Sequence, residues 1–281
     1  MSGVLIHLVL IAAALVGPVQ AALSHFEAGE YDAAIRTLIA AHHVAPEDAG
    51  INYWLARSYY EQENYDLAIA YGEQAVKTAS ENAEYHRWLG RAYGAKAEQS
   101  HSFFLARKVK KAFETAVSLG PLNIAARRDL MQYLVEAPWL VGGDKGKAKE
   151  QIHFIAELDP IQGRLARAAF FSAEKKWEEA EVEYSAVLDR HPDNIEPYME
   201  AADFFADRRD ANNLDRVLAH IGRLGVADPR HDFYRAVVLV LRRADLPTAE
   251  ALLHSYVKNV PQRSDYPSHK SALRWLAATR T

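Results

Sequence analysis

Apolar and small residues recur along this chain with a fixed period of 34 residues. The segment YDAAI at residues 31–35 returns as YDLAI at residues 65–69, and WLARSY at residues 54–59 returns as WLGRAY at residues 88–93. A repeat of this length is typical of short supersecondary units that stack on their neighbours. The pattern therefore predicts an array of helical units rather than one enlarged core.

Each unit is expected to fold as two antiparallel helices, A and B, joined by a short turn. On helix A, Trp54 and Leu55 would pack against helix B, while Ala56 would allow a close helix crossing. Tyr59 would fill the gap toward the next unit, and a proline such as Pro46 would stop helix B. These residues resemble the tetratricopeptide repeat, which implies an all-α solenoid and protein or peptide partners.

The resemblance covers about residues 22–281. In the first unit a short helix A is expected near residues 22–28, with a turn at Gly29 and helix B over residues 31–44. The sixth unit is degenerate, because Leu214 stands where a small residue is expected on helix B. A last amphipathic helix would cover the apolar face of the final unit. The seven units are expected near residues 22–47, 48–81, 82–121, 122–160, 161–192, 193–227 and 228–261, with a capping helix at 264–279.

The period fails at two places. Pro46 predicts helix ends near positions 80 and 114, but the third unit ends at Pro121, seven residues late. The excess lies between residues 94 and 107 and predicts a lengthened helix pair or an inserted turn. The turn of the fourth unit, residues 137–144, is also long. Its Trp139 could offer an exposed contact, but we expect it to pack on the array because large aromatic side chains are mostly buried.

The first 21 residues differ from the rest. Residues 4–16 form an apolar run without a charged side chain, followed by Gly17-Pro18 and a small-x-small site ending at Ala21. This pattern predicts a signal peptide at residues 1–21, cleaved near Ala21, and a periplasmic or secreted mature chain. The start carries no Lys or Arg, so an uncleaved anchor or an N-terminal core helix is the alternative. The chain has no cysteine, which excludes disulfides and thiolate metal sites.

Composition limits the classes of partner. The formal net charge of -4 does not indicate bulk nucleic-acid binding, and no membrane insertion of the mature chain is expected. A basic run at residues 107–111 is interpreted as a solvated face. We expect a monomer; association through apolar helix faces, such as residues 103–105, is the alternative.

No motif indicates catalysis, a cofactor or a metal. The loop GGDKGK at residues 142–147 lacks the pattern of a phosphate-binding loop, since Val141 and Ala148 replace the required glycine and hydroxyl residue. We interpret it as a helix–helix turn whose glycines take positive φ angles. The 12 histidines form no metal-ligand pattern, and adjacent His42 and His43 diverge on a helix. The protein is therefore not expected to be an enzyme.

The family resemblance points to one surface. In such arrays the A helices line a groove for peptides, and the family pattern places seven residues of the second to fourth units there. Four arginines and two tyrosines in one channel favour an anionic ligand, either an acidic segment or a C-terminal carboxylate. Alternatively, the arginines pair with Glu61, Glu84 or Asp129 and only stabilise the array. The predicted groove residues are Tyr53, Arg57, Tyr60, Arg87, Arg91, Arg128 and Gln132.

Together these observations predict a non-enzymatic interaction scaffold of the periplasm or cell envelope that binds a peptide in its groove. The alternative is an accessory domain of an envelope enzyme complex, or an enzyme with a pocket of its own. A closed pocket that holds His153 or His191 beside a carboxylate would favour the alternative.

Overall fold

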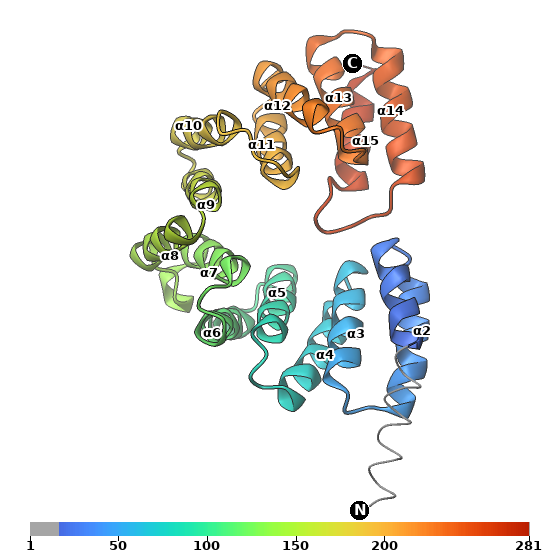
Figure 1. The fold of residues 1–281 in the computed structure, drawn as a ribbon, viewed down its shortest axis with the longest axis vertical. Coiled ribbons are helices and arrows are strands. Elements are labelled where there is room, and N and C mark those ends of the chain that lie inside the picture. Colours follow the sequence, from blue (N-terminus) through green and yellow to red (C-terminus); the bar gives the residue numbers. More distant parts are fainter. Residues whose placement is uncertain (1–16, 281) are drawn as a thin grey trace, which may run out of the picture. The chain divides into compact units, whose positions relative to one another are not determined.

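The computed structural model describes residues 17–280, and within this range it contains helices and turns but no strand (Figure 1). Residues 17–27 form the first helix. Fourteen α-helices and one 3-10 turn follow in the described residues: α2 (Tyr31–Val44), α3 (Ala49–Glu61), α4 (Tyr65–Thr78), α5 (Ala83–Ser100), α6 (Phe103–Leu119), α7 (Ile124–Glu136), η1 (Trp139–Val141), α8 (Lys145–Leu158), α9 (Pro160–Ala173), α10 (Trp177–Leu188), α11 (Glu196–Asp207), α12 (Ala211–Leu224), α13 (Pro229–Arg242), α14 (Leu246–Asn259) and α15 (His269–Ala278). The predicted all-α fold of stacked helix pairs is confirmed.

The helix starts are set by side-chain caps. An Asn, Asp or Ser precedes most helices and accepts a hydrogen bond from a backbone N–H two or three residues later, which satisfies an otherwise unpaired donor. These caps explain why consecutive helices begin sharply after short turns. The capping residues are Asp48, Asn64, Asn82, Ser102, Asn123, Asp159, Asp210, Asp228, Asp245 and Ser268.

The first helix differs from its prediction. It already includes residues 17–21, whereas we expected a helix from residue 22. Pro18 stands at the start of the described helix, where a proline is tolerated because the first helical N–H groups have no partner anyway. Ala22 is buried and belongs to a small core with Leu38 and Leu55. The rest of the predicted signal peptide, residues 1–16, lies outside the described residues.

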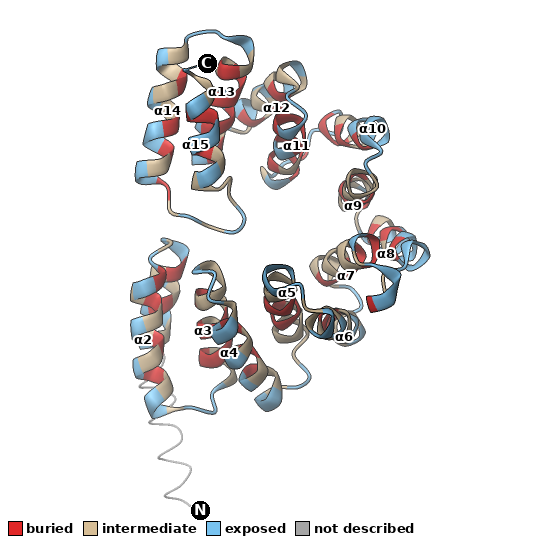
Figure 2. Ribbon diagram, turned by 180° about the vertical axis from the view of Figure 1, so that it is seen from behind, coloured by how far each residue is buried: buried red, intermediate tan, exposed pale blue. Residues whose placement is uncertain are grey.

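The chain divides into two compact blocks, with the boundary inside α8: an N-terminal block up to Ile152 and a C-terminal block from His153. Within the N-terminal block, α3 contacts α4 and α5, and α5 contacts α6 and α7. Buried positions form a stripe along each helix where it meets its neighbours (Figure 2). The A helices α3, α5 and α7 therefore lie side by side as one layer, with the B helices behind them.

The third repeat is enlarged in both of its helices. Helix α5 has 18 residues and α6 has 17, whereas α3 has 13 and α4 has 14. The turn between α5 and α6 is only His101 and Ser102. Of the two predicted alternatives, the seven-residue excess is therefore a lengthened helix pair. Gly90 lies where these helices cross, because a Cβ at this position would come within 2.5 Å of the Phe113 ring.

The C-terminal block has one continuous core from α9 to α15. Leu214, at the degenerate crossing position, is fully buried in it. Helix α15 lies within the segment expected to form the cap and packs on α13 and α14, where Trp275 and Leu276 are buried. This contact covers apolar surface of the last helix pair.

Candidate functional site

The N-terminal block carries all seven predicted groove residues on its A helices. Tyr53, Arg57 and Tyr60 come from α3, and Arg87 and Arg91 come from α5. Arg128 and Gln132 follow on α7. Because α5 contacts both α3 and α7, these three sets lie on neighbouring elements.

Arg57 is surrounded by aromatic rings. Its guanidinium carbon lies 4.1 Å from the ring centre of Trp88, 4.6 Å from Phe26, 4.9 Å from Trp54 and 5.9 Å from Tyr53. Ring faces attract a cation electrostatically, so this aromatic cage holds the charge in place. Among the residues that the structure describes, no carboxylate lies within ion-pair distance of Arg57, and its buried Nε has no hydrogen-bond partner. The positive charge of Arg57 is therefore not neutralised by a neighbouring carboxylate.

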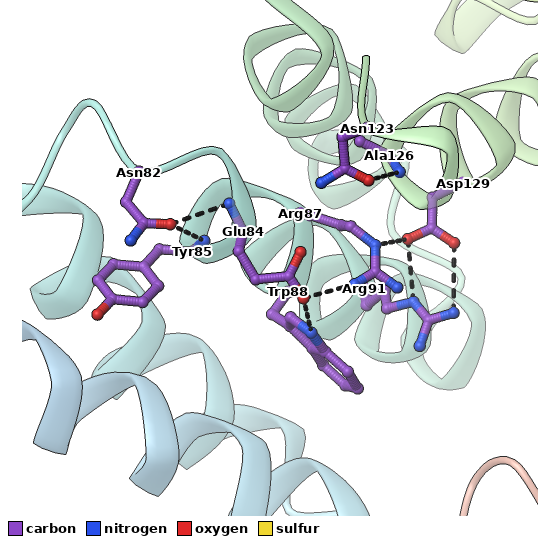
Figure 3. Close-up of polar contacts among 9 residues, drawn as sticks. All are labelled: Asn82, Glu84, Tyr85, Arg87, Trp88, Arg91, Asn123, Ala126 and Asp129. Atoms are coloured by element: carbon purple, nitrogen blue, oxygen red, sulfur yellow. Dashed lines mark hydrogen bonds and ion pairs between the residues drawn. The ribbon is translucent and has the colours of Figure 1, made fainter. Parts of the chain in front are cut away.

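Arg87 and Arg91 behave differently, because both donate to Asp129 of α7 (Figure 3). The Nε atom of Arg87 lies 2.9 Å from Asp129 Oδ2, and Arg91 donates from Nε at 3.1 Å and from Nη2 at 3.3 Å. Arg87 also pairs with Glu84 at 2.6 Å, and the Trp88 indole donates to the same carboxylate at 2.8 Å. Both arginines therefore form ion pairs within the chain, as in the alternative to ligand binding that the sequence left open. Their charges join α5 to α7.

The two predicted tyrosines serve as packing residues. Tyr53 is buried and stacks on Tyr85 with ring centres 4.7 Å apart. Tyr60 meets the Trp88 ring edge-on at 5.6 Å. Burial raises the pKa of both Tyr53 and Tyr60 despite nearby arginines, so both hydroxyls stay protonated near neutral pH. Each tyrosine therefore contributes ring area and a neutral polar tip.

The remaining two predicted residues lie on α7. Arg128 is half-buried, and Gln132 donates a hydrogen bond to Glu136. Gln132 also reaches a cavity that the sequence did not predict. This cavity has a volume of about 560 Å³ and lies between α5, α6, α7 and η1. It is lined by Gly94, Ala97, Glu98, His101, Ser102, Phe103, Ala106, Val109, Phe113, Asp129, Gln132, Tyr133, Glu136, Ala137, Pro138 and Val141.

The turn before α8 differs in part from its prediction. Trp139 is 80% exposed and does not pack on the array, because the one-turn helix η1 directs Val141 inward instead. Gly142 has the expected positive φ, at 99°. Gly143 does not, but a Cβ there would come within 1.8 Å of the Ala137 carbonyl oxygen, so close packing requires glycine. Asp144 caps α8 by accepting the N–H groups of the next turn.

The histidines named as markers of an enzyme lie at the surface. His153 is 73% exposed and pairs with Glu157 at 3.2 Å. His191 is exposed and stacks on His220 with ring centres 5.0 Å apart. Within residues 17–280, no group of three or more His, Cys, Asp or Glu side chains could hold a metal ion. In the same range no helix is both long enough and apolar enough to cross a membrane.

The A helices of the C-terminal block present a different surface. Leu165 and Met199 are buried, and Asp203 of α11 accepts a hydrogen bond from Tyr234 of α13. Burial raises the pKa of Asp203 to about 6, which outweighs the hydrogen bond from Tyr234. Nearby Arg230 is 4% exposed and pairs with Asp228 and Glu196, both at 2.8 Å. None of these residues is a cation without a carboxylate partner, as Arg57 is.

Comparison with known proteins agrees with this architecture. Residues 19–84 match the family model described as tetratricopeptide repeat, and a search of curated proteins finds no match. A tetratricopeptide repeat protein from Parabacteroides merdae shares 13% identity, with 94% of this chain and 98% of that chain covered and a TM-score of 0.57. A thermophilic TPR protein of Thermus thermophilus shares 19% identity over 67% of this chain and 97% of that chain, with a TM-score of 0.55.

Yeast Tom70 is similar over 88% of this chain and 50% of its own, at 14% identity and a TM-score of 0.62. At these identities the similarity concerns the fold alone. The family match at the first repeats and the stacked helix pairs agree with each other. Residues 19–84 therefore match the tetratricopeptide repeat, and the described residues share the fold of solved tetratricopeptide repeat proteins.

Proposed function

We propose that this protein is a non-enzymatic scaffold that binds a partner peptide on the A-helix layer of its N-terminal block. The peptide supplies a carboxylate, from an acidic side chain or a free C-terminus, to Arg57. The scaffold acts in the periplasm or outside the cell. The observation that carries this proposal is the aromatic cage around Arg57, in which a guanidinium is held without a carboxylate partner among the described residues.

The charge distribution separates Arg57 from the other arginines. Arg87 and Arg91 already share Asp129, so an anionic ligand would have to compete with an intramolecular carboxylate. Arg57 offers donors in a fixed orientation, because the rings on its faces restrict the side chain. A guanidinium whose position is fixed in advance loses less conformational entropy when a carboxylate binds. We therefore narrow the predicted ligand contact to Arg57 and assign Arg87 and Arg91 to holding the layer together.

The test compares two neutralised arginines. Arg57→Gln removes the caged charge, while Arg107→Gln removes an exposed arginine of α6 and serves as the matched control. Fluorescent peptide pools, one rich in Asp and Glu with a free C-terminus and one rich in Asn and Gln with an amidated C-terminus, are titrated by anisotropy. We expect the acidic pool to bind about tenfold tighter, and Arg57→Gln to abolish the difference while Arg107→Gln preserves it. Equal binding of both pools to the wild-type chain would overturn the carboxylate proposal.

The proposed location has its own test. Cleavage after Ala21 would remove residues 17–21 from the first helix and leave residues 22–27, including the cage residue Phe26. Cell fractionation combined with intact-mass measurement should find a chain that begins at Ala22 outside the cytoplasm. A full-length chain in the cytoplasm would exclude this location without affecting the binding proposal.

A further inference from the structure

The cavity between α5, α6, α7 and η1 exists because this chain departs from the regular repeat. The lengthened ends of α5 and α6 form one wall, and α7 with the turn after it forms the other. Small residues leave the space open: at Gly94 an added Cβ would have only Val109 as a neighbour, at 4.0 Å. The floor is apolar, with Val109, Phe113 and Val141 all buried.

The cavity is open to ligands of side-chain size. Its volume of about 560 Å³ falls within the range of about 300–1,000 Å³ that small-ligand sites occupy. Phe103 lines it and is 64% exposed, so a large ring stands at the surface instead of filling the space. An exposed apolar ring beside an apolar cavity is the kind of surface that a partner protein covers.

The charged side chains of the lining have one sign. Glu98, Asp129 and Glu136 are acidic, and the lining includes no lysine or arginine. Asp129 is neutralised by its two arginines. Glu136 accepts a hydrogen bond from the neutral Gln132, and Glu98 is exposed and forms no hydrogen bond or ion pair with another residue in the range 17–280. The cavity therefore combines an apolar floor with a negative edge.

We propose that this cavity binds an aromatic or branched aliphatic side chain of a partner protein that carries a lysine or arginine next to it. The apolar group enters between Val109 and Phe113, and the neighbouring cation pairs with Glu98 and Glu136. Charge complementarity selects this occupant over an acidic one, because a carboxylate at the same place would face two uncompensated negative charges. This inference goes beyond carboxylate recognition at Arg57 and does not depend on it.

The test uses three N-acetylated, C-terminally amidated dipeptides: Phe-Arg, Phe-Glu and Ser-Arg. Each is titrated by NMR against the full chain and three variants. Gly94→Leu fills the cavity from a helical position, and Gly94→Ala is its matched control because one methyl group fits there. The double variant Glu98→Gln with Glu136→Gln removes the negative edge without adding bulk and keeps the test informative if Gly94→Leu fails to fold.

We expect millimolar binding of Phe-Arg, about fivefold or more tighter than either other dipeptide. Gly94→Leu and the double variant should each weaken Phe-Arg binding about fivefold or more, while Gly94→Ala stays within about twofold of wild type. Equal affinity for Phe-Arg and Phe-Glu, equal affinity for Phe-Arg and Ser-Arg, or binding that survives Gly94→Leu would each overturn the proposal. None of these results depends on the acidic peptide pools used for Arg57.

Discussion

Two glycines one turn apart on α5 allow the packing of the enlarged repeat to be tested within a single helix. Gly90 lies against α6, and a Cβ built on it would come within 2.5 Å of Cε1 and 2.6 Å of Cδ1 of Phe113. Gly94 faces the cavity, where the nearest atom to an added Cβ is a methyl carbon of Val109 at 4.0 Å. Substituting alanine at each site keeps the helix and the chemistry constant and changes only the available space.

The expected magnitudes follow from two opposing effects. Alanine is favoured over glycine in a helix interior by about 1 kcal/mol. Overpacking a core costs about 1–3 kcal/mol, and the buried Phe113 ring would have to move by about 1 Å to restore a normal contact distance. Gly90→Ala should therefore lower the free energy of unfolding by up to about 2 kcal/mol, and Gly94→Ala should raise it by about 0.5–1 kcal/mol.

Urea unfolding followed by circular dichroism measures both changes against wild type, and the difference between the two variants is the decisive quantity. Because the helix-propensity gain is common to both variants, this difference equals the overpacking cost of about 1–3 kcal/mol, with similar denaturant slopes. If Gly90→Ala is as stable as Gly94→Ala, the close crossing of α5 and α6 does not require glycine. In that case the packing of α5 against α6, and with it the size of the neighbouring cavity, would differ from that described above.

Two further predictions concern carboxylates. Asp129→Asn should lower the free energy of unfolding by about 2–3 kcal/mol in urea, because Arg87 and Arg91 lose the carboxylate that they share, whose side chain is only 15% exposed. Adding Arg91→Gln to this variant should recover part of the loss. A loss below about 0.5 kcal/mol for Asp129→Asn would contradict the assigned role. Burial raises the folded-state pKa of Asp203 from 3.8 to about 6 despite the Tyr234 hydrogen bond, so the stability from its extra proton is present below pH 3.8 and is lost as pH rises through about 6. Asp203→Asn should therefore raise the melting temperature at pH 8 and change it little near pH 4, and an equal effect at both values would refute the shift.

The regular repeats were predictable because local signals agree with packing there. Helix α2 has the predicted bounds, since Gly29 makes the turn before it and Pro46 follows its end. The first helix was placed too late because its residues 17–21 are also those that a signal-peptide pattern uses. The residues of a cleavage-site pattern can also form a helix, and the sequence alone does not decide which of the two structures they adopt.

The site was predictable only in part. The spacing of the A helices correctly placed Arg57, Arg87 and Arg91 on neighbouring elements, but it could not decide which charges are already paired. Asp129 lies 38 and 42 residues from its two arginines, so their meeting depends on how α5 and α7 pack. The cavity was not predicted because it also depends on how the helices pack. Its walls, however, are the two segments where the sequence period fails: the lengthened α5–α6 pair and the long turn before α8.

The cage around Arg57 has a consequence for the stability of the first described helices. Phe26 belongs to the first helix, Trp54 to α3 and Trp88 to α5, so one cation is held by three successive repeats. In repeat proteins each unit contacts only its neighbours, and single helix pairs can open locally. A ligand that requires the complete cage would therefore suppress local opening of the first helix and α2, and amide hydrogen exchange in α2 should slow when it binds. Conversely, loosening the first helix would weaken binding without any substitution at the contact itself.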